Sequence, residues 1–222
     1  SIILDNYNYA RFLPQAIDSV LAQSYEEWEL IIVDDGSTDE SQNIIQAYAD
    51  KEPRIKPIFK QNGGQASAFN AGFAASCGDV LCFLDSDDYF APAKLERVAT
   101  MMANGYDYVY NDNFSVDTDG VLCDDDFKRY RYDGNNLFLV YYLSKYPGCV
   151  TSTLSIRRSL ALRIFPIEDE EGWRIQADDP IVFQAAMMGR AKYFDEKLTY
   201  YRIHNSNGHY GKKRSSDYLY DL

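Results

Sequence analysis

Carboxylates gather where short apolar runs end in the first half of the chain. The segment Asp85-Ser86-Asp87-Asp88 follows the apolar run Val80–Leu84, and Asp5 and Asp35 follow two earlier runs. Helix capping and turns explain part of this pattern, but like charges held close together cost stability unless a cation or ligand offsets them. The pattern therefore predicts a divalent-cation site.

The cofactor expected at this site is Mn²⁺ or Mg²⁺. Hard cations prefer oxygen ligands, commonly one or two carboxylates together with substrate phosphates. Asp87 is the first candidate ligand. The sequence has neither Gly-x-Gly-x-x-Gly after the first apolar run nor Gly-x-x-x-x-Gly-Lys. A diphosphate would therefore approach this acidic edge through a metal.

Alternating apolar and amphipathic segments must position these carboxylates. The four pairs are Ser1–Leu4 with Arg11–Gln23, Glu29–Val33 with Asp39–Asp50, Ile55–Phe59 with Gln65–Ser76, and Val80–Leu84 with Pro92–Asn104. Such βα repeats predict an α/β fold with a Rossmann-like, mostly parallel twisted sheet and helices on both faces. Ligands of these sheets bind at the carboxyl ends of the strands.

After residue 105 the pattern changes to a smaller mixed region. We expect antiparallel strands at Tyr106–Asn111, Phe114–Asp117 and Thr151–Arg157, helices at Asn135–Ser144 and Asp178–Met188, and an extended run at Lys192–His204. No linker rich in Gly, Ser or Pro separates the two regions. We therefore expect a single domain over residues 1–222, with a nucleotide-binding half at 1–105 and an acceptor-side half at 106–222.

Bulk properties exclude several classes of protein. A net charge of −12 argues against nucleic acid as a partner. The four cysteines form no Cys-x-x-Cys pair, which disfavours a zinc site. No apolar run is long enough for a transmembrane segment, so we expect a cytoplasmic protein and leave peripheral association with the inner face of the membrane open. The chain begins without Met and is compatible with a fragment of a longer protein.

Several motifs occur in the order and spacing of a known family. They are Asn6-Tyr7-Asn8, Ser19-Val20-Leu21-Ala22-Gln23, Val33-Asp34-Asp35-Gly36-Ser37-Thr38-Asp39, Asn62-Gly63-Gly64 with Asn70-Ala71-Gly72, and Phe83-Leu84-Asp85-Ser86-Asp87-Asp88. Across residues 1–97 the chain resembles the family 2 glycosyltransferases of GT-A fold. The resemblance implies inverting transfer of a sugar from a nucleoside diphosphate donor, with a UDP-sugar favoured, to a carbohydrate or lipid-linked acceptor hydroxyl.

The resemblance also implies roles on the donor side. Asp35 would hydrogen-bond the base and Asp85 the ribose region, while Asp5 and Tyr7 would flank the base. Asp5 stands where many members carry a small residue or Thr. Lys60 is the basic residue at a strand end, where it would pair with a neighbouring carboxylate or touch the base or ribose.

Metal contacts are expected from both halves of the chain. The resemblance implies that Asp87 ligates the metal, and Asp88 is a further candidate beside it. His204 closes the segment Tyr201-Arg202-Ile203-His204, which in the family approaches the diphosphate. It is therefore a candidate for a metal or phosphate contact.

The resemblance points to Asp179 as the catalytic base. A carboxylate that takes the proton of an acceptor hydroxyl accelerates transfer on the order of 10²–10⁴-fold. The alternative is that Asp178-Asp179-Pro180 merely begins a helix, where early Pro and acidic residues are favourable.

Two other functions remain open at this point. A sugar nucleotidyltransferase would usually carry a Gly-rich basic loop after its first strand, and Asp5–Arg11 does not resemble one. A non-catalytic sugar-nucleotide-binding or assembly module is the alternative from a different class.

Overall fold

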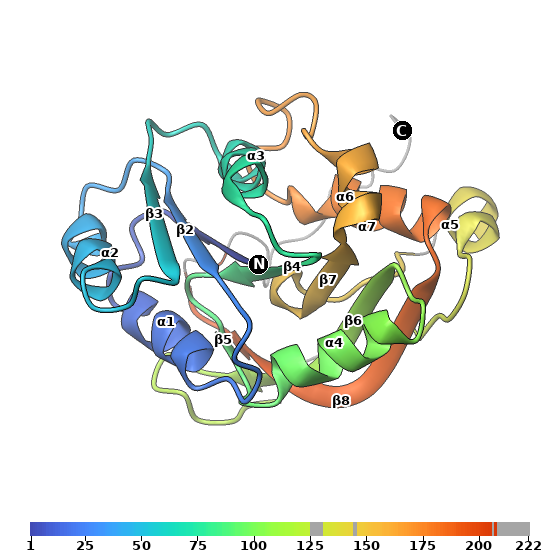
Figure 1. The fold of residues 1–222 in the computed structure, drawn as a ribbon, viewed down its shortest axis with the longest axis horizontal. Coiled ribbons are helices and arrows are strands. Elements are labelled where there is room, and N and C mark those ends of the chain that lie inside the picture. The colour runs from blue at the N-terminus through green and yellow to red at the C-terminus, as the bar shows by residue number, and fades with distance from the viewer. Residues whose placement is uncertain (125–130, 144–145, 206, 208–222) are drawn as a thin grey trace.

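Four parallel strands form the first half of the sheet. The computed structural model describes residues 1–124, 131–143, 146–205 and 207. The strands are β1 (Ile2–Asn6), β2 (Leu30–Asp34), β3 (Ile55–Phe59) and β4 (Val80–Asp85), in the spatial order β3-β2-β1-β4 (Figure 1). Asp5 lies directly opposite Asp85 across β1 and β4. The predicted parallel sheet is confirmed, and its register brings two acidic strand ends together.

Helices cover both faces of this sheet, as predicted. They are α1 (Leu13–Leu21), α2 (Ser41–Ala49), α3 (Gln65–Ala75) and α4 (Lys94–Ala103). Side chains alternate between the faces of a strand, so Ile2 and Leu4 pack with α1, α2 and α4, whereas Ile3 packs with Phe69 of α3. Figure 1 shows α3 on the face opposite α1 and α4.

The second half continues the same sheet with mixed pairing. Its strands are β5 (Tyr89–Phe90), β6 (Tyr108–Val116), β7 (Leu154–Arg157) and β8 (Ala191–Arg202), which complete the eight-stranded order β3-β2-β1-β4-β7-β6-β8-β5. Strand β7 is antiparallel to β4 and β6, β8 is parallel to β6, and β5 is antiparallel to β8. The mixed region of the second half is thus an extension of the parallel sheet.

Strand β6 corrects one prediction. The sequence suggested two strands separated near residue 112, but a single strand crosses Asn111-Asp112-Asn113 with register shifts against β8. These polar side chains are buried and have hydrogen-bond partners. Asn111 Nδ2, for example, donates to Thr199 Oγ1 at 3.1 Å. Polar residues that read as a loop therefore lie inside the sheet.

The remaining helices pack on the α3 face or beside it. They are α5 (Leu137–Leu143), the 3₁₀ helix η1 (Thr151–Thr153), α6 (Arg158–Ile164) and α7 (Asp178–Met188), the last with the predicted bounds. Buried residues of α6 and α7 join Phe69 and Phe83 in one core cluster. Within the described ranges no helix has both the length and the apolar character needed to cross a bilayer.

Glu29 connects the segments that precede β1, β2 and β4 at the amino ends of these strands. Its carboxylate accepts hydrogen bonds from the Cys77 N–H at 2.6 Å, the Ser1 hydroxyl at 2.5 Å and Lys56 Nζ at 2.5 Å. Burial alone would raise the pKa of Glu29, but the hydrogen bonds from Cys77, Lys56 and Ser1 outweigh it and hold the pKa well below its usual range.

Glu29→Gln should therefore destabilise the protein in a pH-dependent way. We expect the free energy of unfolding at pH 7 to fall by about 1–3 kcal/mol, because the donors lose a charged acceptor. The pKa of Glu29 is lower in the folded state than its unfolded-state value of 4.5, so the ionised carboxylate stabilises the folded protein fully above pH 4.5. This stabilisation is lost as the pH falls through the folded-state pKa. The difference from wild type should thus narrow by about 1 kcal/mol between pH 7 and about pH 3.5.

Urea titrations at both pH values measure this difference. Glu26→Gln is the matched control, because that side chain is exposed and should change stability by less than about 0.5 kcal/mol. A pH-independent difference for Glu29→Gln would contradict the assigned ionisation.

Candidate active site

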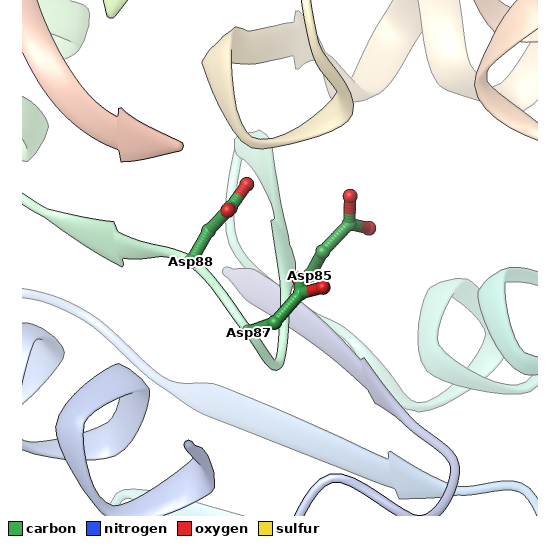
Figure 2. A group of neighbouring side chains, drawn as sticks. All are labelled: Asp85, Asp87 and Asp88. Carbon is green, nitrogen blue, oxygen red and sulfur yellow. The ribbon is translucent and has the colours of Figure 1, made fainter. Parts of the chain in front are cut away.

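A tight turn after β4 carries three carboxylates. The Asp88 N–H donates to the Asp85 carbonyl at 3.0 Å, which closes the turn before β5 begins. Asp85, Asp87 and Asp88 each offer an oxygen, and these atoms all lie within 4.8 Å of one another. Figure 2 shows the three side chains on the turn between β4 and β5. The structure therefore brings together the predicted acidic cluster.

The charges of this cluster are poorly balanced by the chain itself. Burial raises the pKa of Asp85 and of Asp88 well above the usual value, and neighbouring carboxylates raise both further. Asp5 belongs to the same cluster, and its pKa rises to about 7, first because of burial. Closely spaced carboxylate oxygens fit a hard divalent cation such as Mn²⁺ or Mg²⁺, which would offset this repulsion.

Arg202, at the end of β8, forms hydrogen bonds with the turn that carries Asp87 and Asp88. Its side chain is 1% exposed. Its backbone N–H donates to Asp88 Oδ1 at 2.9 Å, and its Nε donates to the Asp87 carbonyl at 2.8 Å. One guanidinium nitrogen also donates to the carbonyls of Asp117 and Thr118. A planar group with several fixed donors can thus fix the turn and offset part of its charge.

Ser152 of η1 provides a second contact under the turn. Its hydroxyl donates to Asp88 Oδ2 at 2.6 Å and accepts from the Asp85 N–H at 3.0 Å. Both Asp88 oxygens therefore already accept hydrogen bonds, one from Ser152 and one from Arg202. Sequence reasoning singled out neither residue. Only the quoted Tyr-Arg-x-His segment could have pointed to Arg202.

His204 lies beside Asp87 in the structure. His204 Nε2 is 2.9 Å from Asp87 Oδ2, although the two residues are far apart in sequence. The imidazole stacks on Phe12 with ring centroids 5.2 Å apart and meets the edge of Tyr9 at 5.6 Å. Packing against Tyr9 and Phe12, which precede α1, therefore orients the ring toward the acidic turn.

Asp35 organises the neighbouring strand end. Its Oδ1 accepts from Lys60 Nζ at 2.7 Å and from the Gly63 N–H at 2.9 Å, and its Oδ2 accepts from the Gly64 N–H at 2.7 Å. Of the two contacts expected for Lys60, the structure forms the pairing with a carboxylate. Gly36 has a φ of 80°, and an added Cβ would lie 2.8 Å from the Asn62 nitrogen, so this turn requires glycine.

Asp5 and Tyr7 occupy different surroundings. Tyr7 directly follows β1 and is 48% exposed. Asp5 Oδ1 is buried, and no hydrogen-bond partner for it exists within the described part of the chain. The β1–β4 register places Asp5 beside Asp85, so its carboxyl faces the acidic turn.

The start of α7 lies next to this turn. Asp178 and Asp179 form the first turn of the helix, and the Tyr146 hydroxyl donates to Asp178 Oδ2 at 3.1 Å. The charge of Asp178 contributes to the raised pKa of Asp85. Gln65 joins the two regions, because its amide contacts both Asp85 and the Ala177 N–H. Gln65 and Asp178 thus place the start of α7 beside the Asp85 carboxylate.

Comparison with known proteins agrees with this arrangement. Residues 1–165 match the family model described as Glycosyl transferase family 2. An uncharacterized glycosyltransferase of Nostoc sp. (strain PCC 7120), alr2836, is 40% identical over 221 residues, which cover 94% of this chain and 66% of that protein. The chain therefore spans slightly less than two thirds of that relative.

Solved structures show the same fold. S. aureus TarS 1–349 in complex with UDP-GlcNAc matches with a TM-score of 0.71 and 21% identity, over 93% of this chain and 59% of that one. The mannosyltransferase PcManGT from Pyrobaculum calidifontis, in complex with GDP-Man and Mn²⁺, matches with a TM-score of 0.66 and 16% identity, over 92% and 57%. At these identities the likeness concerns the fold alone. The chain belongs to glycosyl transferase family 2 and has the GT-A fold.

Proposed function

We propose that this chain is an inverting, metal-assisted glycosyltransferase that moves a sugar from a nucleoside diphosphate donor to an acceptor hydroxyl. The convergence of the Asp85–Asp88 turn, the Asp35 loop and the start of α7 at one sheet edge carries the proposal. A nucleotide, a cation and an acceptor would then meet at a single site. The acceptor would be a carbohydrate or a lipid-linked sugar.

On the donor side, Asp35 and Tyr7 would contact the base and Asp85 the ribose. Asp35 is already oriented by Lys60 and by the Gly63 and Gly64 N–H groups, so its carboxylate is held in one position. This preorganisation lowers the entropy cost of binding. A UDP-sugar is the favoured donor, because TarS, which was solved with UDP-GlcNAc, matches this chain with the higher TM-score. PcManGT, which was solved with GDP-Man, matches with the lower one.

Asp87 would be the principal metal ligand, with His204 and Asp88 beside it. Asp87 Oδ2 and His204 Nε2 already adjoin each other. Asp88 would contribute mainly by shaping the turn, since both of its oxygens accept hydrogen bonds from the protein. A bound Mn²⁺ or Mg²⁺ would supply positive charge where the departing diphosphate gains negative charge.

Asp179 would act as the base that takes the proton of the acceptor hydroxyl. It lies in the first turn of α7, at the end of the helix where an acidic residue interacts favourably with the helix dipole. Direct attack on the anomeric carbon needs no covalent enzyme intermediate. The configuration of the transferred sugar would therefore invert.

Metal-dependent nucleotide binding provides the first test. UDP, GDP and CDP should be compared by thermal shift with and without MnCl₂. We expect UDP with Mn²⁺ to give the largest rise in melting temperature, because a UDP-sugar is the proposed donor. A ligand at 100 times its Kd stabilises the folded state by about 2.7 kcal/mol. Asp87→Asn should abolish the part of the shift that depends on Mn²⁺.

Asp195→Asn is the matched control, because Asp195 is an exposed aspartate of β8. This variant should retain the wild-type shift. Failure of every nucleotide to change the melting temperature in a metal-dependent way would refute the proposed function.

Asp179→Asn provides the second test. The amide has the shape of the carboxylate but cannot take a proton. We therefore expect kcat for UDP release from the donor to fall on the order of 10²–10⁴-fold, while the Kd for UDP with Mn²⁺ stays within about threefold. Asp178→Asn is the neighbouring control and should have the smaller effect on kcat.

Release of UDP in the absence of acceptor is the convenient readout. Many transferases hydrolyse their donor slowly, so wild-type protein that binds UDP-sugars but never releases UDP would indicate a binding module instead. Near wild-type turnover by Asp179→Asn would remove that residue from its role.

A further inference from the structure

The side chain of Gln65 spans the gap between the two parts of the site. Its Nε2 donates to Asp85 Oδ1 at 3.2 Å, and its Oε1 accepts from the Ala177 N–H at 3.0 Å. Gln65 is the first residue of α3, Asp85 ends β4, and Ala177 immediately precedes α7. A single amide therefore connects the acidic turn to the helix that begins with Asp178 and Asp179.

The backbone around Gln65 strengthens this connection. The Gln65 N–H donates to the Arg174 carbonyl at 3.0 Å, and the Ala66 N–H donates to the Trp173 carbonyl at 3.2 Å. The first N–H groups of a helix have no partner within the helix, and here the segment before α7 accepts hydrogen bonds from two of those of α3. An added Cβ on Gly64 would lie 2.6 Å from Arg174 Cα, which shows how closely the two segments approach.

The start of α7 depends on this external support. Its N-cap residue is Ala177, whose side chain cannot accept a hydrogen bond from the helix. Gln176 precedes it with a φ of 63°, a conformation that non-glycine residues seldom adopt. The segment that positions Asp179 is therefore held in place by contacts to α3, among them the Gln65 amide.

Glutamine is suited to this bridge for a chemical reason. The contact with Asp85 needs a donor, and the contact with Ala177 needs an acceptor, and an amide has both at one end of its side chain. Asn is one methylene shorter, and Glu would place another carboxylate against Asp85. Few other side chains could make both contacts from this position.

We propose that Gln65 is a positioning residue that fixes the distance and orientation between the Asp85–Asp88 turn and Asp179. This inference rests on the proposed function, because it concerns the alignment of donor and base. Gln65 acts through its hydrogen bonds with Asp85 and with the backbone at Ala177.

Gln65→Met tests the proposal, because Met has a similar length but makes neither hydrogen bond. We expect kcat for release of UDP from UDP-GlcNAc with Mn²⁺ to fall about 10- to 100-fold, since a misplacement of about 1 Å can cost on the order of 10²-fold. The Kd for UDP with Mn²⁺, measured by calorimetry, should stay within about threefold of wild type. Gln65→Asn keeps the amide but cannot span the gap, so it should reproduce the fall in kcat if Gln65→Met does not fold.

Asn70→Leu is the matched structural control. Asn70 also lies on α3 and binds the segment before α7, through the Ile167 N–H at 2.7 Å and the Ile167 carbonyl at 3.0 Å. Among the described residues, no hydrogen bond joins Asn70 to Asp85 or to Ala177. We expect Asn70→Leu to lower the melting temperature at least as much as Gln65→Met, with kcat within about threefold of wild type.

A double-mutant cycle separates positioning from general damage. If Gln65 acts by aligning Asp179, then Gln65→Met should cause no further fall in kcat when Asp179 is already Asn. Wild-type kcat in Gln65→Met, or a full multiplicative loss in the double variant, would overturn the inference while leaving the proposed function intact. Absence of UDP binding and release by wild-type protein would instead overturn the proposed function.

Discussion

Repulsion between buried carboxylates is the constraint on which the arrangement of this site depends. Asp5 and Asp85 end neighbouring strands in direct register, and Asp87 and Asp88 follow within the next turn. Each of these charges raises the free energy of the others, because little water reaches them. The surrounding structure can be understood as a set of contacts that hold this cluster together and leave it complementary to a cation.

Most of those contacts come from the second half of the chain. Strand β7 lies between β4 and β6, which places Ser152 of η1 under the turn. Strand β8 pairs with β5 directly after the turn, so its end delivers Arg202 and His204 to Asp88 and Asp87. If Ser152 and Arg202 did not make these contacts, Asp88 would be a buried carboxylate without partners, which is strongly destabilising. The extension of the sheet is therefore part of the acidic site.

On the α3 face of the sheet, the turn after β2 is connected with the segment before α7. Asp35 at the end of β2 binds the Gly63 and Gly64 N–H groups, which fixes the start of α3. The first residues of α3 then bind the segment before α7. Hydrogen bonds on both sides of Gly64 thus connect the proposed base-binding residue with the segment that precedes the proposed catalytic base. Such rigidity suits a reaction in which donor and acceptor must be aligned.

The sequence by itself determined the features that depend on local pattern. Continuous apolar runs and helical periodicity predicted the βα units, and the acidic residues after those runs predicted the cation site around Asp87. The bounds of α7 also agreed, because its acidic start and terminal glycine are local signals. Roles for Asp35, Asp179 and His204 came from family motifs rather than from chemistry that could be read at each position.

Only the tertiary structure decided which of these residues meet. The register of β1 and β4 put Asp5 beside Asp85, and a register has no local signature in either strand. Arg202 and Gln65 went unnoticed because such residues are usually exposed, and their partners lie far away in sequence. Strand β6 was divided at Asn111 because a buried polar residue looks like a loop until its partner Thr199 is known. Long-range partners of polar groups are set by topology, which the order of residues alone does not reveal.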